Sequence, residues 1–323
     1  MTKNSSPLKA VQTLALGIVC YLSLQAAPVW SQVRPLHTRD VTRLSEPQVA
    51  KQLKRSDVIF IPIGSVETNG IVPSDSNYTS ALGYAMAMAE ETGGLYSPGL
   101  VHSFPGTTVI GSSSIYMTPS QGVTFLKIVA RSLLRQGFRR QVYLSSGHGP
   151  APLTGATLVR EFFEETHVPI LYIEMGGHLR SLNISREEMS KAVYGCHYIT
   201  GRLTDLPVEG DYGPKESRPA GPVPENTGLS KLNELHYTGS LALGSWIADV
   251  MAHGGGSSRA LPADAAEREA WGIEGEAQVR KAIKQMRINE AMAALKEHDE
   301  FTQRVIVPKF GKMLPTISDS LVR

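Results

Sequence analysis

The chain has almost no cysteine and no excess of charge of either sign. It holds two cysteines among 323 residues, and its 32 basic and 30 acidic residues give a formal net charge of +2. No stretch gathers Lys and Arg together with aromatic residues, as a nucleic-acid-binding surface does, so no nucleic-acid partner is expected. The hydrophobic content of 41% is enough for a sizeable core, which argues against disorder. We therefore expect a folded protein with a small-molecule or peptide partner.

Long hydrophobic runs are also missing, with one exception near the N-terminus. Lys3 and Lys9 precede a mostly apolar run from Val11 to Leu24, and small residues follow it in QAAPVWSQ. This order predicts a secretory signal over residues 1–32, and a secreted or periplasmic protein with no stable membrane association after cleavage. An uncleaved membrane anchor stays open, although the run is shorter than the ~20 residues that span a bilayer.

The predicted signal leaves one cysteine in the mature chain. Cys20 lies inside the signal, so only Cys196 remains after cleavage. An exported protein with one cysteine has no internal disulfide, and its stability must come from its core.

Three apolar runs rich in β-branched and aromatic residues have the length of buried strands. They are DVIFIPIG ending at Gly64, RQVYLSSG ending at Gly147 and VPILYIE ending at Glu174. Apolar residues with helical spacing occupy segments that begin at Thr79, Thr118 and Leu153. Strands that alternate with helices predict an α/β fold, with a mostly parallel sheet covered on both faces.

The second half of the chain changes composition twice. Residues 206–228 are rich in Pro, Gly and charge, and such a long loop is either a lid or subunit contact, or a surface excursion. A helix is expected over 239–252. Residues 261–323 are polar and rich in helix formers, which predicts a helical C-terminal extension that faces solvent or an oligomer partner. We therefore divide the mature chain into an α/β domain of 33–260 and this extension, and expect a homo-oligomer.

Carboxylates, amides and imidazoles follow the predicted strands. Ligands of open parallel sheets bind beyond the carboxyl ends of the strands, so these side chains are expected at one edge. Carboxylate with imidazole is the ligand set of zinc, manganese or a similar divalent ion, which activates water for hydrolysis. Each residue alone also has an ordinary reading as part of a turn or a helix start. The residues are, in chain order, Glu67 and Asn69, then His148, then Glu174 and His178.

Several segments resemble the creatininase (creatinine amidohydrolase) family. These are IPIGSVETNG, FPGTTVIG and LLRQGFRRQVYLSSGHG, and the match covers about residues 57–174. The family's pattern runs Pro-x-Gly-Ser-x-Glu-Gln-His-Gly, then Phe-Pro-Gly-Thr, then Gly-Phe-Arg-Arg ahead of Asn-Gly-His-Gly-Gly-Asn. The resemblance implies a three-layer αβα sandwich, a dinuclear metal site and hydrolysis of a C–N bond in a cyclic amide, formamide or small peptide.

The resemblance carries over to some of the family's metal ligands and fails at others. Its first Glu falls on Glu67 and the His of its Gly-His-Gly turn falls on His148. Its next His is replaced by Asn69, and its bridging Asp is replaced by Asn77. Neutral amide oxygens neither offset the charge of metal ions nor bind them as tightly, so one ion is favoured over two. Asp75 either supplies the missing carboxylate or is an ordinary helix N-terminal residue.

The resemblance thus predicts an amidohydrolase that acts on a small-molecule amide with metal-activated water. The alternative is a catalytically inactive relative that binds a ligand or a partner, with no metal. The predicted metal ligands are Glu67, Asp75 and His148, with Asp75 or Glu174 moving protons. The candidate substrate contacts are Asn69, Asn77, His178 and His197, the last in a segment CHYITG that resembles a later His-Ala-Gly-Glu of the family.

The signal makes a direct prediction about the exported protein. Its mature N-terminus should lie between Ala27 and Val33, because small residues suited to cleavage follow the apolar run there. N-terminal sequencing of the exported protein measures this, and an exported protein that still begins at Met1 would remove the secretory interpretation.

Overall fold

The computed structural model describes residues 36–100, 113–115, 117–146, 151–212, 231, 234–235 and 260–314. The predicted signal and the helix expected over 239–252 lie outside these residues. The main elements are α2 (Glu46–Leu53), β1 (Val58–Pro62), α3 (Ser76–Thr92), β2 (Leu95–Tyr96), α4 (Pro119–Gln136), β3 (Arg140–Ser145), α5 (Ala151–Thr166), β4 (Leu171–Glu174), α6 (Met175–Ser181), α7 (Arg186–Ile199), α8 (Glu209–Tyr212), α11 (Ala265–Gln285), α12 (Ile288–Phe301) and α13 (Val307–Phe310).

Four parallel strands form one sheet in the order β2–β1–β3–β4. The central pair, β1 and β3, runs in register from Val58 opposite Arg140 to Pro62 opposite Leu144. The three strands predicted from the sequence are confirmed as β1, β3 and β4. β2 was not predicted, because its two residues are too short to give an apolar pattern.

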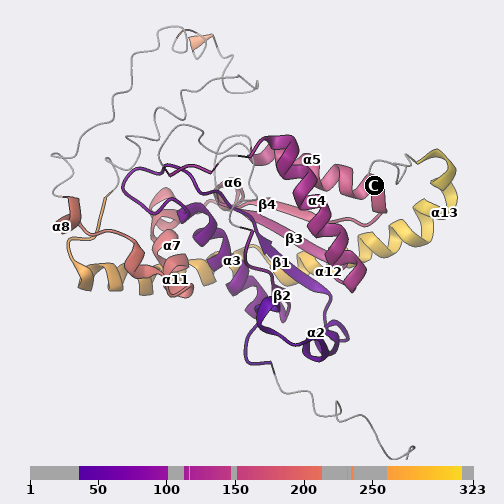
Figure 1. The fold of residues 1–323 in the computed structure, drawn as a ribbon, viewed down its shortest axis with the longest axis horizontal. Helices are drawn as coiled ribbons and strands as arrows, with labels where there is room; N and C mark the ends of the chain where they lie inside the picture. Colours follow the sequence, from indigo (N-terminus) through magenta and orange to yellow (C-terminus); the bar gives the residue numbers. More distant parts are fainter. Residues whose placement is uncertain are drawn as a thin grey trace, which may run out of the picture.

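Helices cover both faces of the sheet, which makes the three-layer αβα sandwich that was expected (Figure 1). Alternate residues of β1 point to opposite layers, as the two-residue period of a strand requires. Val58 and Phe60 pack in a cluster with residues of α3, α7, α11 and α12. Ile59 and Ile61 pack in the other cluster, with residues of α4 and α5. All five residues of β1 are buried, which explains why its sequence is a continuous apolar run and does not alternate with polar residues.

The bounds of α4 follow from its end residues. Thr118 is the N-cap and forms a capping box with Gln121, and Pro119 occupies the first helical position. Gly137 ends the helix with φ 106°, a left-handed conformation that a side chain disfavours. The sequence therefore sets both ends of this helix locally.

The C-terminal helices are part of the core. α11 packs along α7 so closely that a Cβ atom added to Gly195 would lie 2.0 Å from the carbonyl carbon of Gly275. Val279 and Ile283 of α11 and Leu295 of α12 are buried in the same cluster as Phe60. Residues 261–323 were expected to form a solvent-facing or partner-facing extension, but the inner faces of α11 and α12 stabilise the sheet domain itself.

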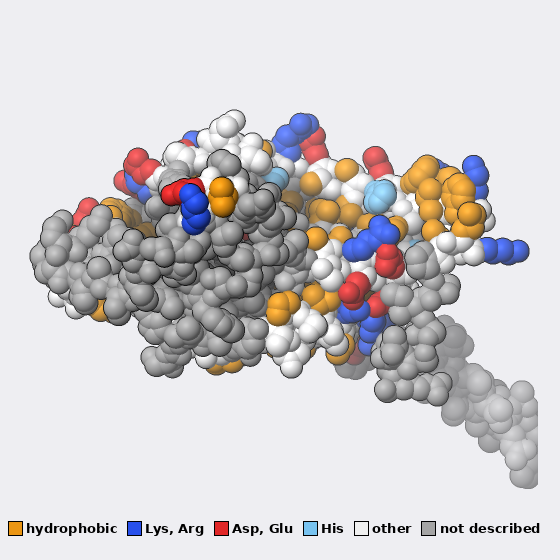
Figure 2. All heavy atoms as spheres, turned by 90° about the horizontal axis from the view of Figure 1, so that it is seen from above, with side chains coloured by type: hydrophobic (Ala, Val, Ile, Leu, Met, Phe, Trp, Pro, Cys, Tyr) orange, Lys and Arg blue, Asp and Glu red, His pale blue; other side chains and the backbone are white. Residues whose placement is uncertain are grey.

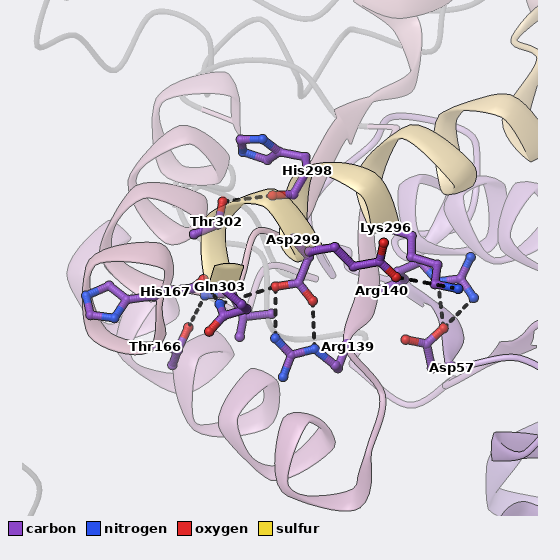
Figure 3. Close-up of polar contacts among 12 residues, drawn as sticks. Asp57, Arg139, Arg140, Thr166, His167, Lys296, His298, Asp299, Thr302 and Gln303 are labelled. Atoms are coloured by element: carbon purple, nitrogen blue, oxygen red, sulfur yellow. Dashed lines mark hydrogen bonds and ion pairs between the residues drawn. The ribbon is translucent and has the colours of Figure 1, made fainter. Parts of the chain in front are cut away.

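Ion pairs and hydrogen bonds connect the C-terminal helical segment and the strands at the amino ends of the strands (Figure 3). Arg139, just before β3, donates to both carboxylate oxygens of Asp299 in α12, at 2.6 and 2.8 Å. Arg140 Nε donates to Asp57 Oδ1, before β1, at 2.6 Å. Gln303 Nε2 donates to the carbonyl oxygen of His167 at 2.7 Å. These contacts lie at the opposite edge of the sheet from the carboxyl ends of the strands.

Some large apolar side chains are exposed at the surface. Phe301, Phe310 and Met313 are exposed near the C-terminal end of the described chain. Figure 2 shows hydrophobic side chains beside Lys and Arg at the right-hand end of the molecule, where α13 lies in Figure 1. Among the described residues, no helix is long and apolar enough to cross a membrane. The homo-oligomer stays a prediction.

Two isoleucines of α11 test the contribution of this helix to the core. Ile283 is 2% exposed and Ile273 is 54% exposed. Ile283→Ala should lower the free energy of unfolding by about 2–5 kcal/mol because it leaves a cavity in the core. The matched control Ile273→Ala should change it by less than about 0.5 kcal/mol. Chemical denaturation measures both, and equal effects would contradict the packing of α11 against the sheet domain.

Candidate functional site

The carboxyl ends of β1, β3 and β4 border one cavity of about 710 Å³. Asn69 lies in the loop after β1, and Asn77 lies in the first turn of α3. Ser146 follows β3 and Gly176 follows β4, and both also line the cavity. The Ser146 hydroxyl donates to the backbone oxygen of Asn77 at 2.5 Å, which ties the end of β3 to the start of α3. The cavity therefore lies where parallel sheets bind ligands.

The opposite wall of the cavity comes from α6, α7 and α11. The rings of Tyr194 and Trp271 meet edge to face, with centroids 5.1 Å apart and an interplanar angle of 84°. Three charged side chains accompany them, and all lie on α6 or α7. The apolar residues of this wall are Met175, Leu179, Met189, Val193, Tyr194 and Trp271, and the charged ones are Arg180, Glu187 and Lys191.

The sequence pattern does not predict this wall. A single tryptophan in the charged segment AEREAWGIEGEAQ was its one visible signal, because a large ring on a polar helix usually has an apolar contact. The contact itself depends on how α11 packs against α7, which the sequence pattern does not give.

The Glu67 carboxylate accepts hydrogen bonds from two described side chains, Ser65 and Asn77. Ser65 Oγ donates to Glu67 Oε1 at 2.8 Å, and Asn77 Nδ2 donates to the same oxygen at 2.7 Å. The backbone N–H of Glu67 also donates to the carbonyl oxygen of Ser74 at 3.0 Å, which closes the loop between them. The structure therefore brings the predicted residues Glu67 and Asn77 into direct contact.

Asp75 is paired with an arginine that follows α7. Arg202 Nη1 and Nη2 reach the two carboxylate oxygens of Asp75 at 2.5 and 3.1 Å. The same guanidinium group donates to Thr79 Oγ1 at 2.8 Å and to Asp205 Oδ2 at 2.9 Å. Hydrogen bonds from Arg202 to these carboxylates, first of all to Asp75, raise the pKa of Arg202. Asp75 is thus the N-cap residue of α3 with its charge balanced within the chain.

Glu174 and His178 have structural positions at the end of β4. Glu174 is the N-cap of α6, and its carboxylate accepts hydrogen bonds from the backbone N–H groups of Gly176 and Gly177. His178 lies in α6, and its carbonyl oxygen accepts a hydrogen bond from Ser181 Oγ at 2.6 Å. Neither residue is among the described side chains that line the cavity.

His197 is fully buried in α7 and is not among the described residues that line the cavity. Its Nδ1 lies 2.9 Å from the carbonyl oxygen of Val193, and within the described part of the chain its Nε2 has no hydrogen-bond partner. Burial lowers the pKa of His197, and the nearby charge of Arg202 lowers it further. The imidazole is therefore neutral near pH 7. His148 lies outside the described residues.

The described residues do not fit a dinuclear metal centre. No group of three or more His, Cys, Asp or Glu side chains comes together among them in a way that could hold an ion. Glu67 accepts from Ser65 and Asn77, Asp75 is paired with Arg202, and Glu174 caps a helix. At the position where the resemblance implies a bridging aspartate, the amide of Asn77 donates to Glu67 instead.

The fold and the cavity define a three-layer α/β protein with a ligand site at the carboxyl edge of a parallel sheet. Its fold is that of the creatininases. A crystal structure of creatinine amidohydrolase (creatininase) covers 78% of this chain and 98% of its own, with a TM-score of 0.51 and 13% sequence identity. A zinc–zinc form of a mutant creatininase covers 81% and 98%, with a TM-score of 0.50 and 15% identity.

A third structure is a Bacteroides fragilis protein that carries the provisional name creatinine amidohydrolase. It covers 80% of this chain and 96% of its own, with a TM-score of 0.50 and 15% identity. No protein-family model and no curated protein sequence matches this chain. The comparisons thus establish a shared fold.

The buried imidazole predicts a pH dependence of stability. An unfolded His has a pKa of about 6.5, and the folded pKa of His197 is lower, so between the two values the unfolded chain binds more protons. The free energy of unfolding should therefore fall as the pH drops below about 6.5, by about 1.4 kcal/mol for each unit of the shift. Below the folded pKa the loss levels off.

Denaturation curves at a series of pH values measure this effect. His197→Gln should flatten the dependence, whereas His298→Gln, at an exposed position of α12, should leave it as in the wild type. An unchanged slope in the His197 variant would contradict the neutral buried imidazole.

Proposed function

We propose that this protein binds a small amide-containing molecule in the cavity at the carboxyl edge of the sheet, without a dinuclear metal centre. The observation that carries the proposal is the hydrogen bond of 2.7 Å from Asn77 Nδ2 to Glu67 Oε1. The resemblance assigns a bridging aspartate to the position of Asn77, so two carboxylates would meet there around metal ions. Here an amide donor satisfies the remaining carboxylate.

The lining of the cavity supports a small polar ligand with an apolar body. The edge of the sheet offers neutral groups that both donate and accept, from Asn69, Asn77 and Ser146. Tyr194 and Trp271 offer an aromatic wall opposite them. A volume of about 710 Å³ is within the range of sites for small molecules.

A metal-dependent amidohydrolase that cleaves a C–N bond is the second candidate. One observation favours it: Glu67 keeps a carboxylate at the end of β1, next to a residue that lines the cavity. One of the creatininase structures with this fold is a zinc–zinc form. This candidate needs His148 and at least one further strong ligand beside Glu67. In either case we propose that the protein is exported and loses residues 1–32.

Metal content separates the two candidates. Wild-type protein equilibrated with zinc and then desalted should hold no stoichiometric metal. The double variant Asn69→His with Asn77→Asp should also hold none. It should lower the free energy of unfolding by about 2–4 kcal/mol, because it replaces a donor to Glu67 by a second carboxylate. Elemental analysis and thermal denaturation measure both quantities.

A matched control adds the same groups elsewhere. Gln136→His with Gln285→Glu places them at exposed positions and should leave stability within about 0.5 kcal/mol of wild type. One zinc ion per chain in the wild type that is lost in Glu67→Gln, or a double variant that gains metal and stability together, would overturn the binding proposal in favour of the hydrolase.

A further inference from the structure

The charges that line the cavity are unevenly distributed. The edge of the sheet contributes neutral side chains, and the wall of α6 and α7 contributes Arg180, Glu187 and Lys191. Lys191 Nζ is already paired, with Glu274 Oε2 at 3.1 Å and with Glu187 Oε1 at 3.6 Å. Among the described residues that line the cavity, Arg180 is therefore the cation that has no acidic partner in an ion pair.

The guanidinium group of Arg180 lies over the start of α6. A Cβ atom added to Gly176 would lie 3.5 Å from Arg180 Nη1, and one added to Gly177 would lie 3.7 Å from Nη2. Because Gly176 itself lines the cavity, the guanidinium group stands at the rim of the site. Both glycines lack a side chain that would separate it from the ligand space.

The carboxylate next to Arg180 is that of Glu174, and it already accepts two backbone hydrogen bonds. One of its oxygens accepts from the backbone N–H of Gly176, and the other accepts from the backbone N–H of Gly177. Within the described part of the chain, no ion pair or side-chain hydrogen bond joins Arg180 to an acidic residue. The five N–H donors of a guanidinium group form a planar fork that matches a carboxylate. The rim of the cavity thus presents a carboxylate-binding group.

We propose that the ligand of this cavity carries a carboxylate, which binds to the guanidinium group of Arg180. This inference rests on the proposed binding function and names the class of ligand. The carboxylate would lie at the rim, the amide would reach Asn69 and Asn77, and an apolar or aromatic body would lie against Trp271. An N-acylated amino acid has these three parts in a small molecule.

Paired probes test the carboxylate directly. Hippurate and hippuramide differ only in a terminal carboxylate against a carboxamide, and so do N-acetylphenylalanine and N-acetylphenylalaninamide. In isothermal titration calorimetry at low salt, each carboxylate should bind the wild type about 10–100-fold more tightly than its amide, as expected for a hydrogen-bonded charged group. Arg180→Gln should remove this preference and leave the binding of the amides unchanged.

Two further variants separate recognition from general charge. Arg180→Lys should keep part of the preference, because it keeps the charge and loses the fork. Arg135→Gln removes the same charge at an exposed position of α4 and should have no effect. Circular dichroism establishes that each variant is folded.

The outcomes distinguish this inference from the function it rests on. Equal binding of carboxylates and amides, or a preference that persists in Arg180→Gln, would overturn the carboxylate assignment and leave the binding function standing. If no member of either pair binds the wild type, both the assignment and the binding function are overturned.

Discussion

The parallel pairing of β1 with β3 is the constraint on which the rest of the structure depends. The two strands are buried on both faces and stay in register over five residue pairs, so their carboxyl ends meet at one edge. That edge brings the loop after β1 next to Ser146, and it fixes where a ligand can bind. At the other edge, Arg139 forms an ion pair with Asp299 and Arg140 forms one with Asp57.

The carboxylates of Glu67 and Asp75 at the carboxyl edge have hydrogen-bond partners within the chain. The Asn77 amide donates to Glu67, and the Arg202 guanidinium group binds both oxygens of Asp75. Burying a carboxylate in part is unfavourable in free energy unless the group is hydrogen-bonded or paired with a cation, and a metal ion is one such cation. Here the Asn77 amide stabilises Glu67 and the Arg202 guanidinium group stabilises Asp75. The creatininase fold is therefore compatible with a site that does not depend on two ions.

The fold followed from the sequence because its strands are continuous apolar runs with clear ends. β1 and β3 were found this way, whereas β2 has two residues and no pattern. The sparse apolar residues of α11 predict an element that faces solvent or an oligomer partner, yet Ile283 is buried and Gly275 allows the close contact with Gly195. Such packing depends on which helices meet, and a local pattern does not contain that information.

The site was predictable only in part. Asn69, named from its position after β1, and Asn77, named from the resemblance, both line the cavity, and Asn77 donates to Glu67. Trp271 was missed because it reaches the cavity from α11, far from any strand-end motif, and Arg180 was missed although it lies two residues after His178 in α6. Their roles arise from tertiary packing.

One measurement tests the central claim most directly, that the Asn77 amide occupies the place of a bridging metal ligand. Crystals grown with excess zinc can be examined by anomalous scattering at the zinc edge. The account predicts an intact hydrogen bond between Asn77 Nδ2 and Glu67 Oε1, with no anomalous peak within bonding distance of that carboxylate. A peak about 2.0–2.2 Å from both Glu67 and His148 would contradict it.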